Sequence, residues 1–406
     1  MTNEASELHN VDAVLVRYGE IGIKSDRVRS RYERTLVNNI RNVLDFRAIK
    51  YDAVVRDFGR IFVQTRDSRA AQVVARVFGV VSTSAVSTSA ANLAAMSSAA
   101  VRIVSPLLAD GQSFGIRARR TGSHDYSSKD IGEVVGGAIK NATGAPVQLS
   151  NPDVQLFIEV RANNAYLYTE VIPGVGGLPL GTQGKIVALI SGGIDSPVAA
   201  WLMMKRGCTI VPVFFDCAPY IGDGAQRRAH AVVKALAAWA GRPLEFAVVH
   251  HGDSLAEFKK AAPRMTCVLC KRMMYRIATS VAKDKRAHGI ATGESIGQVA
   301  SQTTANLLAI DDAAAVPVFR PLIGFDKTES IKLARRIGTY RLSTAGDPLS
   351  CTAAHRHPTT NANKEELETH EAELLVDELS AKETHSIAWR QLPPDSSFQW
   401  ELAADN

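Results

Sequence analysis

The second half of the chain alternates short apolar runs with amphipathic segments of helical period. The apolar runs are rich in β-branched residues and lie at 186–190, 209–215, 244–249 and 289–292. Continuous apolar runs of this kind are typical of the buried strands of a parallel sheet, whose connections are helices. The pattern therefore predicts a doubly wound parallel sheet, followed by one acidic amphipathic helix at 365–379.

The first half has a different pattern, in which polar hairpins follow short strands and helices. A strand at 11–18, an arginine-rich helix ending at residue 44 and a hairpin at 53–64 predict a small ferredoxin-like unit. More helices and strands predict a second unit, and a stretch with five glycines and two prolines predicts a linker. We thus expect α+β domains at 1–67 and 68–172, a linker at 173–184 and an α/β domain at 185–406.

Length and composition fit a multidomain globular protein. The chain has 406 residues, of which 46% are hydrophobic and 22% are charged. No apolar run approaches the ~20 residues needed to span a bilayer, and the polar N-terminus lacks a signal-peptide core. These features predict a cytoplasmic protein with no membrane partner.

The charge is distributed unevenly along the chain. From residue 361 onward there are 3 Lys and Arg residues against 11 Asp and Glu residues. The residues before it contain 44 basic against 30 acidic side chains, a net charge of +14. A basic body favours a polyanionic partner such as RNA, although an ordinary solvated surface could have the same composition.

The sharpest chemical signal is SGGIDSP, which directly follows the apolar run at 186–190. Two glycines allow a tight turn and close approach to a ligand, while Ser196 and Pro197 suit the N-cap and first position of a helix. A strand, a glycine turn and a helix N-terminus gather backbone N–H groups around an anion. The spacing is not GxxxxGK[ST]; it matches SGGxDS, the pyrophosphate loop of ATP pyrophosphatases.

The five cysteines supply a second signal. Their odd number in a cytosolic chain argues against a disulfide framework, and Cys208 and Cys217, which bracket an apolar run, are expected to be buried packing residues. Cys267 and Cys270 form a CxxC pair, with Cys351 about eighty residues later. If a helix begins at Cys267, its dipole and the adjacent cations should lower the pKa of both thiols.

Three kinds of chemistry remain open for Cys267, Cys270 and Cys351. Three thiolates could hold a [4Fe–4S] cluster with one iron left open, a departure from the usual four cysteines, and that iron could carry sulfide. Zinc could bind the same thiols with His355 or His357. Alternatively, Cys351 could carry a persulfide that Cys267 or Cys270 resolves.

Several collinear stretches resemble the tRNA 4-thiouridine synthetase family. They are RYGEI at 17–21, SFGIRARR at 113–120, GGLPLGTQG at 176–184, SGGIDSP at 191–197, KRMM at 271–274, TGESIGQVASQT at 292–303 and RPLIGFDK at 320–327. The resemblance implies a ferredoxin-like domain, a THUMP RNA-binding domain and a pyrophosphatase domain. It implies thiolation of the uridine at position 8 of tRNA, in which ATP adenylates the C4 oxygen and sulfur then displaces AMP.

The resemblance also implies roles for individual residues. Asp195 would hold Mg²⁺ between phosphates, Lys327 would neutralise phosphoryl charge, and Cys351 would act in sulfur transfer. Relatives with a rhodanese domain use a persulfide, whereas the archaeal-like form without one, which this chain resembles, is associated with a cluster. ATP would contact Leu189, Ile190, Ser191, Gly192, Gly193, Asp195, Ser196, Phe214, Phe215, Lys271, Gly293 and Gln302. Several relatives have His at the position of Phe214.

Recognition of tRNA is predicted to depend on phosphate contacts and shape. Arg117, Arg119, Arg120 and Lys129 would form a basic face with the arginines of the first helix. The sulfur would come from sulfide or from a cysteine desulfurase, and a homodimer is one option for the assembly. Competing functions are 2-thiolation of a tRNA pyrimidine, non-catalytic tRNA binding and sulfur supply for the thiazole of thiamine.

Overall fold

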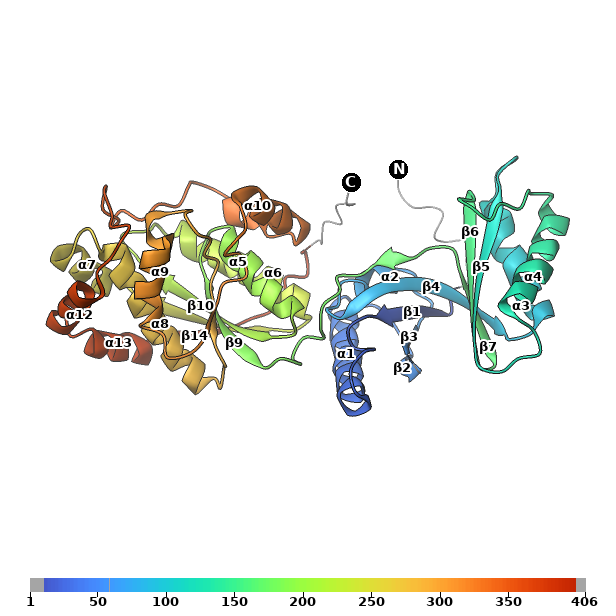
Figure 1. Cartoon of the computed structure of the whole chain (residues 1–406), viewed down its shortest axis with the longest axis horizontal. Coiled ribbons are helices and arrows are strands. Elements are labelled where there is room, and N and C mark those ends of the chain that lie inside the picture. Colours follow the sequence, from blue (N-terminus) through green and yellow to red (C-terminus); the bar gives the residue numbers. More distant parts are fainter. Residues whose placement is uncertain (1–10, 58, 399–406) are drawn as a thin grey trace. The chain divides into compact units, whose positions relative to one another are not determined.

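A computed structural model of the chain describes residues 11–57 and 59–398 and divides it into two compact units, 1–177 and 178–406. Each unit has its own sheet and its own hydrophobic core (Figure 1). The α+β first half and the α/β second half are therefore as the hydrophobic pattern predicts. Of the helices in the described ranges, none is long and apolar enough to cross a membrane.

One long strand, β4 (Val80–Ala90), runs through the whole first unit. Its first part pairs with β1 (Ala13–Tyr18) and its last part with β7 (Asn164–Tyr168), so two groups of strands form one sheet in the order β2-β3-β1-β4-β7-β6-β5. The other strands are β2 (Ala53–Asp57), β3 (Arg60–Gln64), β5 (Phe114–Thr121), β6 (Val154–Arg161) and β8 (Ile172–Pro173), which pairs with β4.

Helices complete the first unit at positions where the sequence supplies capping residues. Asn92 caps α3 by accepting from the backbone N–H of Ala95, and Ser127 and Asp130 form a capping box at α4. Apolar side chains of α3 and α4 pack on β5, β6 and β7 as one core. The helices are α1 (Asp26–Phe46), α2 (Arg69–Val74), α3 (Leu93–Val104), a 3₁₀ turn at Ser105–Leu107 and α4 (Ser128–Thr143).

The second unit has a parallel sheet with the strand order β13-β12-β9-β10-β11-β14. The chain passes from β9 outward to β10 and β11, then returns to place β12 on the other side of β9. The carboxyl ends of the neighbouring strands β9 and β12 thus form the topological switch point, where doubly wound folds bind ligands. The parallel strands are β9 (Lys185–Ile190), β10 (Thr209–Asp216), β11 (Leu244–His250), β12 (Ile290–Ala291) and β13 (Val318–Phe319).

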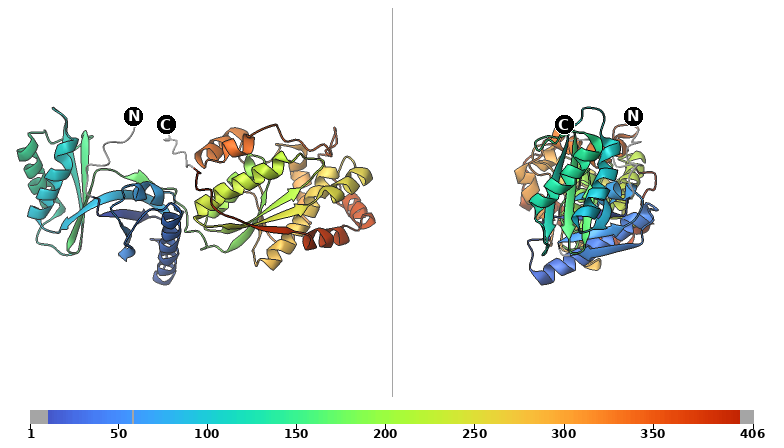
Figure 2. Two further views of the ribbon diagram at one scale, coloured as in Figure 1. Left: turned by 180° about the vertical axis from the view of Figure 1, so that it is seen from behind. Right: turned by 90° about the vertical axis from the view of Figure 1, so that its right-hand side faces the viewer.

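Helices cover both faces of this sheet (Figure 2). One layer contains α5 (Asp195–Lys205), α6 (Gly224–Ala240), α10 (Lys327–Arg336) and α11 (Tyr340–Thr344). The other contains α7 (Gly252–Ala261), α8 (Thr266–Asp284) and α9 (Thr304–Asp311), with a 3₁₀ turn at Ala300–Gln302.

The end of the second unit differs from the sequence-based prediction. The predicted single helix at 365–379 is two helices, α12 (Lys364–Glu373) and α13 (Val376–His385), separated by Leu375 in the left-handed conformation with φ 50°. The break lets Leu367 and Val376 both enter the core. The chain then forms β14 (Ala388–Leu392), which pairs antiparallel with β11 at the edge of the sheet.

Candidate nucleotide and thiol site

The loop after β9 is held in place by the hydroxyl groups of its own serines. The backbone N–H of Ser191 donates to Ser196 Oγ over 2.8 Å, and the N–H of Gly193 donates to Ser191 Oγ over 3.2 Å. The two hydroxyls lie 3.1 Å apart. The loop is therefore preorganised before any anion arrives.

The N-cap of the helix after this loop differs from the sequence-based prediction, and the first glycine of the loop has a packing role. Helix α5 begins at Asp195 with Ile194 at the N-cap, so Ser196 is not the cap; its hydroxyl binds the loop instead. Gly192 packs closely on the loop that carries Leu349, since a Cβ there would lie 2.5 Å from Leu349 Cδ1 and this side chain would have to shift. The predicted tight turn is thus explained by close packing on the neighbouring loop.

Asp195 lies where α5, α10 and the loop after β12 meet. Its Oδ2 accepts from Lys327 Nζ over 2.7 Å and from Gln298 Nε2 over 3.0 Å. Its Oδ1 is buried and has no hydrogen-bond partner within the described part of the chain. Lys327 is the first residue of α10, whose start is fixed by a capping box between Asp326 and Glu329. One carboxylate oxygen is therefore committed to the cation and the other is free for a ligand.

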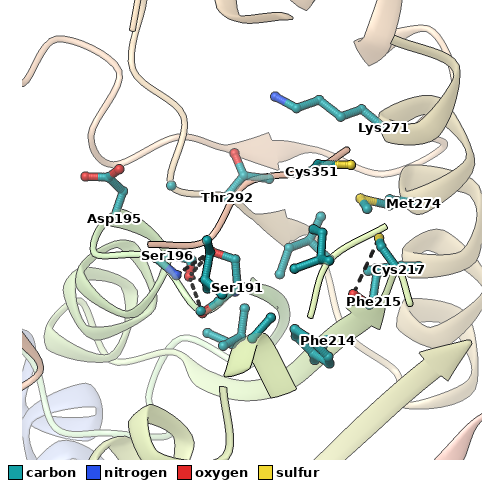
Figure 3. Close-up of a pocket in the computed structure, with 18 of the residues that line it drawn as sticks. Ser191, Asp195, Ser196, Phe214, Phe215, Cys217, Lys271, Met274, Thr292 and Cys351 are labelled. Carbon is teal, nitrogen blue, oxygen red and sulfur yellow. Dashed lines mark hydrogen bonds between the residues drawn. The ribbon is translucent and has the colours of Figure 1, made fainter. Parts of the chain in front are cut away.

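A cavity of about 420 Å³ opens beside this loop at the switch point, and Figure 3 shows many of its lining side chains. This volume suits a small-molecule or cofactor site. Every residue assigned to ATP in the sequence analysis lines it: Leu189, Ile190, Ser191, Gly192, Gly193, Asp195, Ser196, Phe214, Phe215, Lys271, Gly293 and Gln302. Cys351 lines it as well, whereas Lys327, Cys267 and Cys270 do not belong to its lining.

The loop after β12 approaches the SGGIDSP loop so closely that it needs a glycine. A Cβ on Gly293 would lie 2.7 Å from the backbone of both Asp195 and Ser196. In the same cavity, Gln302 has a buried Oε1 without a partner in the described ranges, which leaves an acceptor for a ligand.

Glu294 organises the opposite wall through four donors. Its carboxylate accepts from Lys271 Nζ at 2.7 Å, Tyr275 Oη at 2.9 Å, Thr292 Oγ1 at 3.0 Å and Arg320 Nε at 2.7 Å. Burial alone would raise the pKa of Glu294, but Lys271 and Arg320 outweigh burial and lower it to about 2. The ionised carboxylate thereby holds Lys271 at the edge of the cavity.

The thiol end of the cavity contains one more cysteine than predicted. Cys217, expected to be a packing residue, is buried but also lines the cavity together with Cys351. In Figure 3 both lie at the end away from Asp195. Cys267 and Cys270 lie in the first turns of α8, where the sequence predicts a helix to start.

The predicted lowering of the cysteine pKa values is wrong. Burial raises the pKa of Cys267 and of Cys351, and a hydrogen bond to Cys217 together with burial raises that of Cys270 well above its usual range. Lys271 lowers the pKa of Cys267, but by less than burial raises it. Desolvation by the packed core therefore outweighs the cations that the sequence shows.

The described residues contain no group of three His, Cys, Asp or Glu side chains close enough to hold a single metal ion. His355 Nδ1 is hydrogen-bonded to the backbone of His357, so this ring nitrogen is already engaged. Zinc needs ligands that converge on one atom, whereas a cluster has each cysteine on a different iron. In the described residues, the thiols therefore lack the convergent geometry of a tetrahedral zinc site.

The basic residues of the first unit do not share one face of β5. Alternation along the strand exposes Arg117 and Arg119 on one side, while Arg120 lies on the side of Ile116 and Ala118, which pack toward the helices. Arg120 donates to the carbonyl of Gly122 over 2.9 Å. Lys129, on α4, is exposed beside Glu133. Arg117 and Arg119 are thus the more accessible pair.

The sequence analysis missed four residues of the second unit, Cys217, Glu294, Gln298 and Arg320. Glu294 and Gln298 lie inside TGESIGQVASQT, and Arg320 begins RPLIGFDK, so their motifs contained a signal. Cys217 follows the apolar run of β10 directly, at the edge where parallel strands place ligands. Its position at a strand end was the available signal.

An anion loop and an unpaired carboxylate oxygen beside one cavity at a switch point define a nucleotide-binding domain of the ATP pyrophosphatase class. Family models agree with this assignment. They are "ThiI ferredoxin-like domain" at residues 13–84, "THUMP domain" at 90–170 and "Thiamine biosynthesis protein (ThiI)" at 181–376.

Relatives match over nearly the whole chain. A probable tRNA sulfurtransferase of Methanosarcina mazei is 45% identical over 93% of this chain and 95% of its own length, and one of Methanothermobacter thermautotrophicus is 41% identical over 86% and 90%. The crystal structure of a 4-thiouridine synthetase–RNA complex with bound ATP matches with a TM-score of 0.86 and 31% identity, covering 94% of this chain and 100% of that one. The chain belongs to the tRNA sulfurtransferase family.

Proposed function

We propose that this chain is an ATP-dependent tRNA sulfurtransferase that converts the uridine at position 8 of tRNA to 4-thiouridine. The observation that carries the proposal is one cavity with an anion loop at one end and cysteines at the other. A solved relative titled a 4-thiouridine synthetase contains both RNA and ATP, which supports the same substrates here.

The first step makes a leaving group out of an unreactive carbonyl oxygen. The C4 oxygen of uridine attacks the α-phosphate of ATP, and pyrophosphate departs. The departing pyrophosphate is surrounded by Ser191, Gly192, Gly193 and Ser196. Internal hydrogen bonds already hold this loop, so its donors are in place before the reaction begins. Lys327 is 2.7 Å from Asp195 and neutralises charge on the phosphates. Leu189, Ile190, Phe214, Phe215, Gly293 and Gln302 contact the rest of the nucleotide.

Asp195 is the residue that would hold Mg²⁺. The free Oδ1 supports this role, since a buried carboxylate oxygen without a partner is suited to a hard cation. A bound ion would supply charge neutralisation between the phosphates. Oδ2 is fixed by Lys327 and Gln298, so the carboxylate is oriented before ATP binds.

The second step replaces the adenylated oxygen with sulfur and releases AMP. Cys267, Cys270 and Cys351 would hold a [4Fe–4S] cluster, which when bound would supply the reactive sulfur, taken from sulfide or from a cysteine desulfurase. The soft sulfur donors and their failure to converge on one atom in the described residues support this assignment over zinc. Cys351 lines the cavity, so it is the member of the group nearest to the reacting base.

Binding of tRNA is assigned to the first unit, where the THUMP model matches. Arg117, Arg119 and Arg120 of β5, with Lys129 of α4, would contact phosphates and give affinity with little sequence information. We further propose a cytoplasmic location and, for the assembly, a homodimer.

The direct test is mass spectrometry of tRNA nucleosides from a strain that lacks this gene. We expect 4-thiouridine to disappear and to return on complementation with the wild-type gene but not with an Asp195→Asn copy. Unchanged 4-thiouridine together with loss of a 2-thiopyrimidine would favour 2-thiolation. If no thionucleoside changes, the proposed function is wrong.

A further inference from the structure

Four of the five cysteines gather at one end of the cavity, although the motifs point to only three. Cys217 directly follows β10 at the carboxyl edge of the sheet and is 5% exposed. Of the four, it and Cys351 line the cavity, whereas Cys267 and Cys270, on α8, do not. Cys217 therefore borders the cavity and is also in contact with Cys270 on α8.

Cys217 contacts one backbone carbonyl group and two of the other thiols. Its S–H is directed at the carbonyl oxygen of Phe215, at 3.7 Å, and its sulfur also shares a hydrogen bond with the half-buried thiol of Cys270. Cys217 is also close enough to Cys351 to contribute to the raised pKa of that thiol. The fifth cysteine, Cys208, precedes β10 at the opposite edge of the sheet and faces the carbonyl of Gln183 at 4.0 Å.

We propose that Cys217 is a fourth, displaceable thiolate ligand of the cluster, and this inference rests on the cluster assigned under the proposed function. Three cysteines leave one iron of a [4Fe–4S] cluster without a protein ligand, and such clusters normally have four. Cys217 is the one further thiol that the described residues bring to this group. It would ligate the fourth iron in the resting protein and leave it when sulfide binds.

This exchange replaces one sulfur anion by another. Hydrosulfide would take the place of the Cys217 thiolate, so the exchange would need no electron transfer and would leave the net charge unchanged. The released thiolate can take a proton from solvent and return to its hydrogen bond with the carbonyl of Phe215. The ligand would protect the cluster while no sulfur donor is present.

The test compares the anaerobically reconstituted full-length wild type with Cys217→Ala and with Cys208→Ala as a matched control. The two cysteines are similarly buried, 5% and 7% exposed, so the same truncation is made in both. Iron and acid-labile sulfide per chain give cluster content, and a ferrous chelator gives the rate of iron loss. A sulfide titration followed by electron paramagnetic resonance of the reduced cluster gives the midpoint of ligand exchange.

In Cys217→Ala we expect iron loss to be on the order of tenfold faster, as when a residue supporting a metal site is removed. The sulfide midpoint should fall roughly tenfold, because sulfide no longer competes with a protein thiolate. Cys208→Ala should match the wild type in both. If Cys217→Ala matches the wild type too, Cys217 is not a ligand.

Two other results, failure of the wild type to take up a cluster and failure of the variant to fold, can be told apart from the absence of an effect in Cys217→Ala. If the wild type takes up no iron and sulfide, the cluster of the proposed function is wrong and this inference falls with it. If Cys217→Ala does not fold, as judged by circular dichroism, Cys217→Ser keeps the volume of the side chain. A serine variant with wild-type iron loss and sulfide midpoint would equally overturn the proposal.

Discussion

The two ends of the cavity are built in opposite ways. At the phosphate end, charged and hydroxyl groups are fixed by hydrogen bonds, as in the pairing of Asp195 with Lys327 and Gln298. At the thiol end, burial raises the pKa of Cys267 and Cys351, and a hydrogen bond to Cys217 together with burial raises that of Cys270. The first end is ready to stabilise developing negative charge, whereas the second needs a metal or a partner to draw its thiols into the anionic form.

Because the two ends are built from different groups, adenylation and sulfur transfer should be separable by mutation. In the described part of the chain, the hydrogen bonds of Asp195 go to Lys327 and Gln298 and not to a thiol. The thiols come from the residue after β10, from α8 and from the loop that carries Cys351. A change at one end should therefore stop one step and leave the other intact.

The largest effect is expected for Asp195→Asn. The change removes the charge that faces Lys327 and leaves the oxygen assigned to Mg²⁺ as a weaker, neutral ligand. We expect tRNA-dependent ATP–pyrophosphate exchange to fall on the order of a thousandfold, as for other lost transition-state electrostatics, while tRNA affinity stays within a few-fold. Gln298→Ala, which removes one hydrogen bond from the same carboxylate, is the matched milder variant. Full exchange activity in Asp195→Asn would exclude the residue from adenylation.

Cys351→Ala should give the complementary result. This cysteine lines the cavity but has no contact with Asp195 or Lys327 in the described structure. We expect formation of 4-thiouridine to be lost while pyrophosphate exchange is kept, with Cys208→Ala unaffected in both assays. A variant that loses exchange as well would show that the two ends are not separate.

A smaller effect, on stability, is expected for Glu294→Gln. The variant leaves Lys271 and Arg320 without their buried counter-charge, which should cost about 3 kcal/mol in the free energy of unfolding. Tryptophan fluorescence reports on this unit alone, because all four tryptophans follow residue 178. Glu245→Gln, at a more exposed ion pair with Lys285, is the control and should cost less than about 1 kcal/mol.

The same residue gives a signed pH dependence. The pKa of Glu294 is about 2 in the folded state against an ordinary value of 4.5. Its ionised form therefore stabilises the fold above pH 4.5, and this contribution, about 3 kcal/mol by linkage, is lost as the pH falls from 4.5 toward 2. Urea unfolding of the wild type between pH 7 and pH 3 should show the loss, and Glu294→Gln should show a shallower slope. Equal slopes would contradict the assignment.

The smallest effect is expected on RNA binding. Arg117→Ala with Arg119→Ala removes two exposed cations from one side of β5, so the slope of log affinity against log salt should fall by roughly two and affinity several-fold. The Arg120→Ala variant is the comparison, since Arg120 binds the carbonyl of Gly122 and should change the slope less. Pyrophosphate exchange at saturating tRNA should be unchanged. An identical salt slope for the double variant and the wild type would remove this strand from the RNA site.

The local pattern of apolar and polar residues predicted most of the strands and helices. It predicted much less of the contacts and pKa values in the site. Apolar runs located β9, β10 and β11 because buried strands are continuous in sequence. The pairing of β4 with two strand groups, and of β14 with β11, depends on residues far apart in the chain, which periodicity does not report. The break at Leu375 follows from packing on the core in the same way.

The site shows the same limit. SGGIDSP identified an anion loop because its chemistry lies within seven consecutive residues. Cys217 lies fifty residues before the CxxC pair and joins it only in the folded protein, and burial of the thiols reverses the pKa shift that neighbouring cations suggested. Motifs therefore give the reactive groups, whereas three-dimensional packing sets their protonation and their additional partners.

The central claim is that the C4 oxygen of the target uridine is adenylated in this cavity and leaves with AMP. The most direct measurement uses tRNA that carries oxygen-18 at C4 of uridine 8, with purified protein, ATP and a sulfur donor. The account predicts AMP containing one oxygen-18 atom for each 4-thiouridine formed. Unlabelled AMP beside labelled water or pyrophosphate would contradict it.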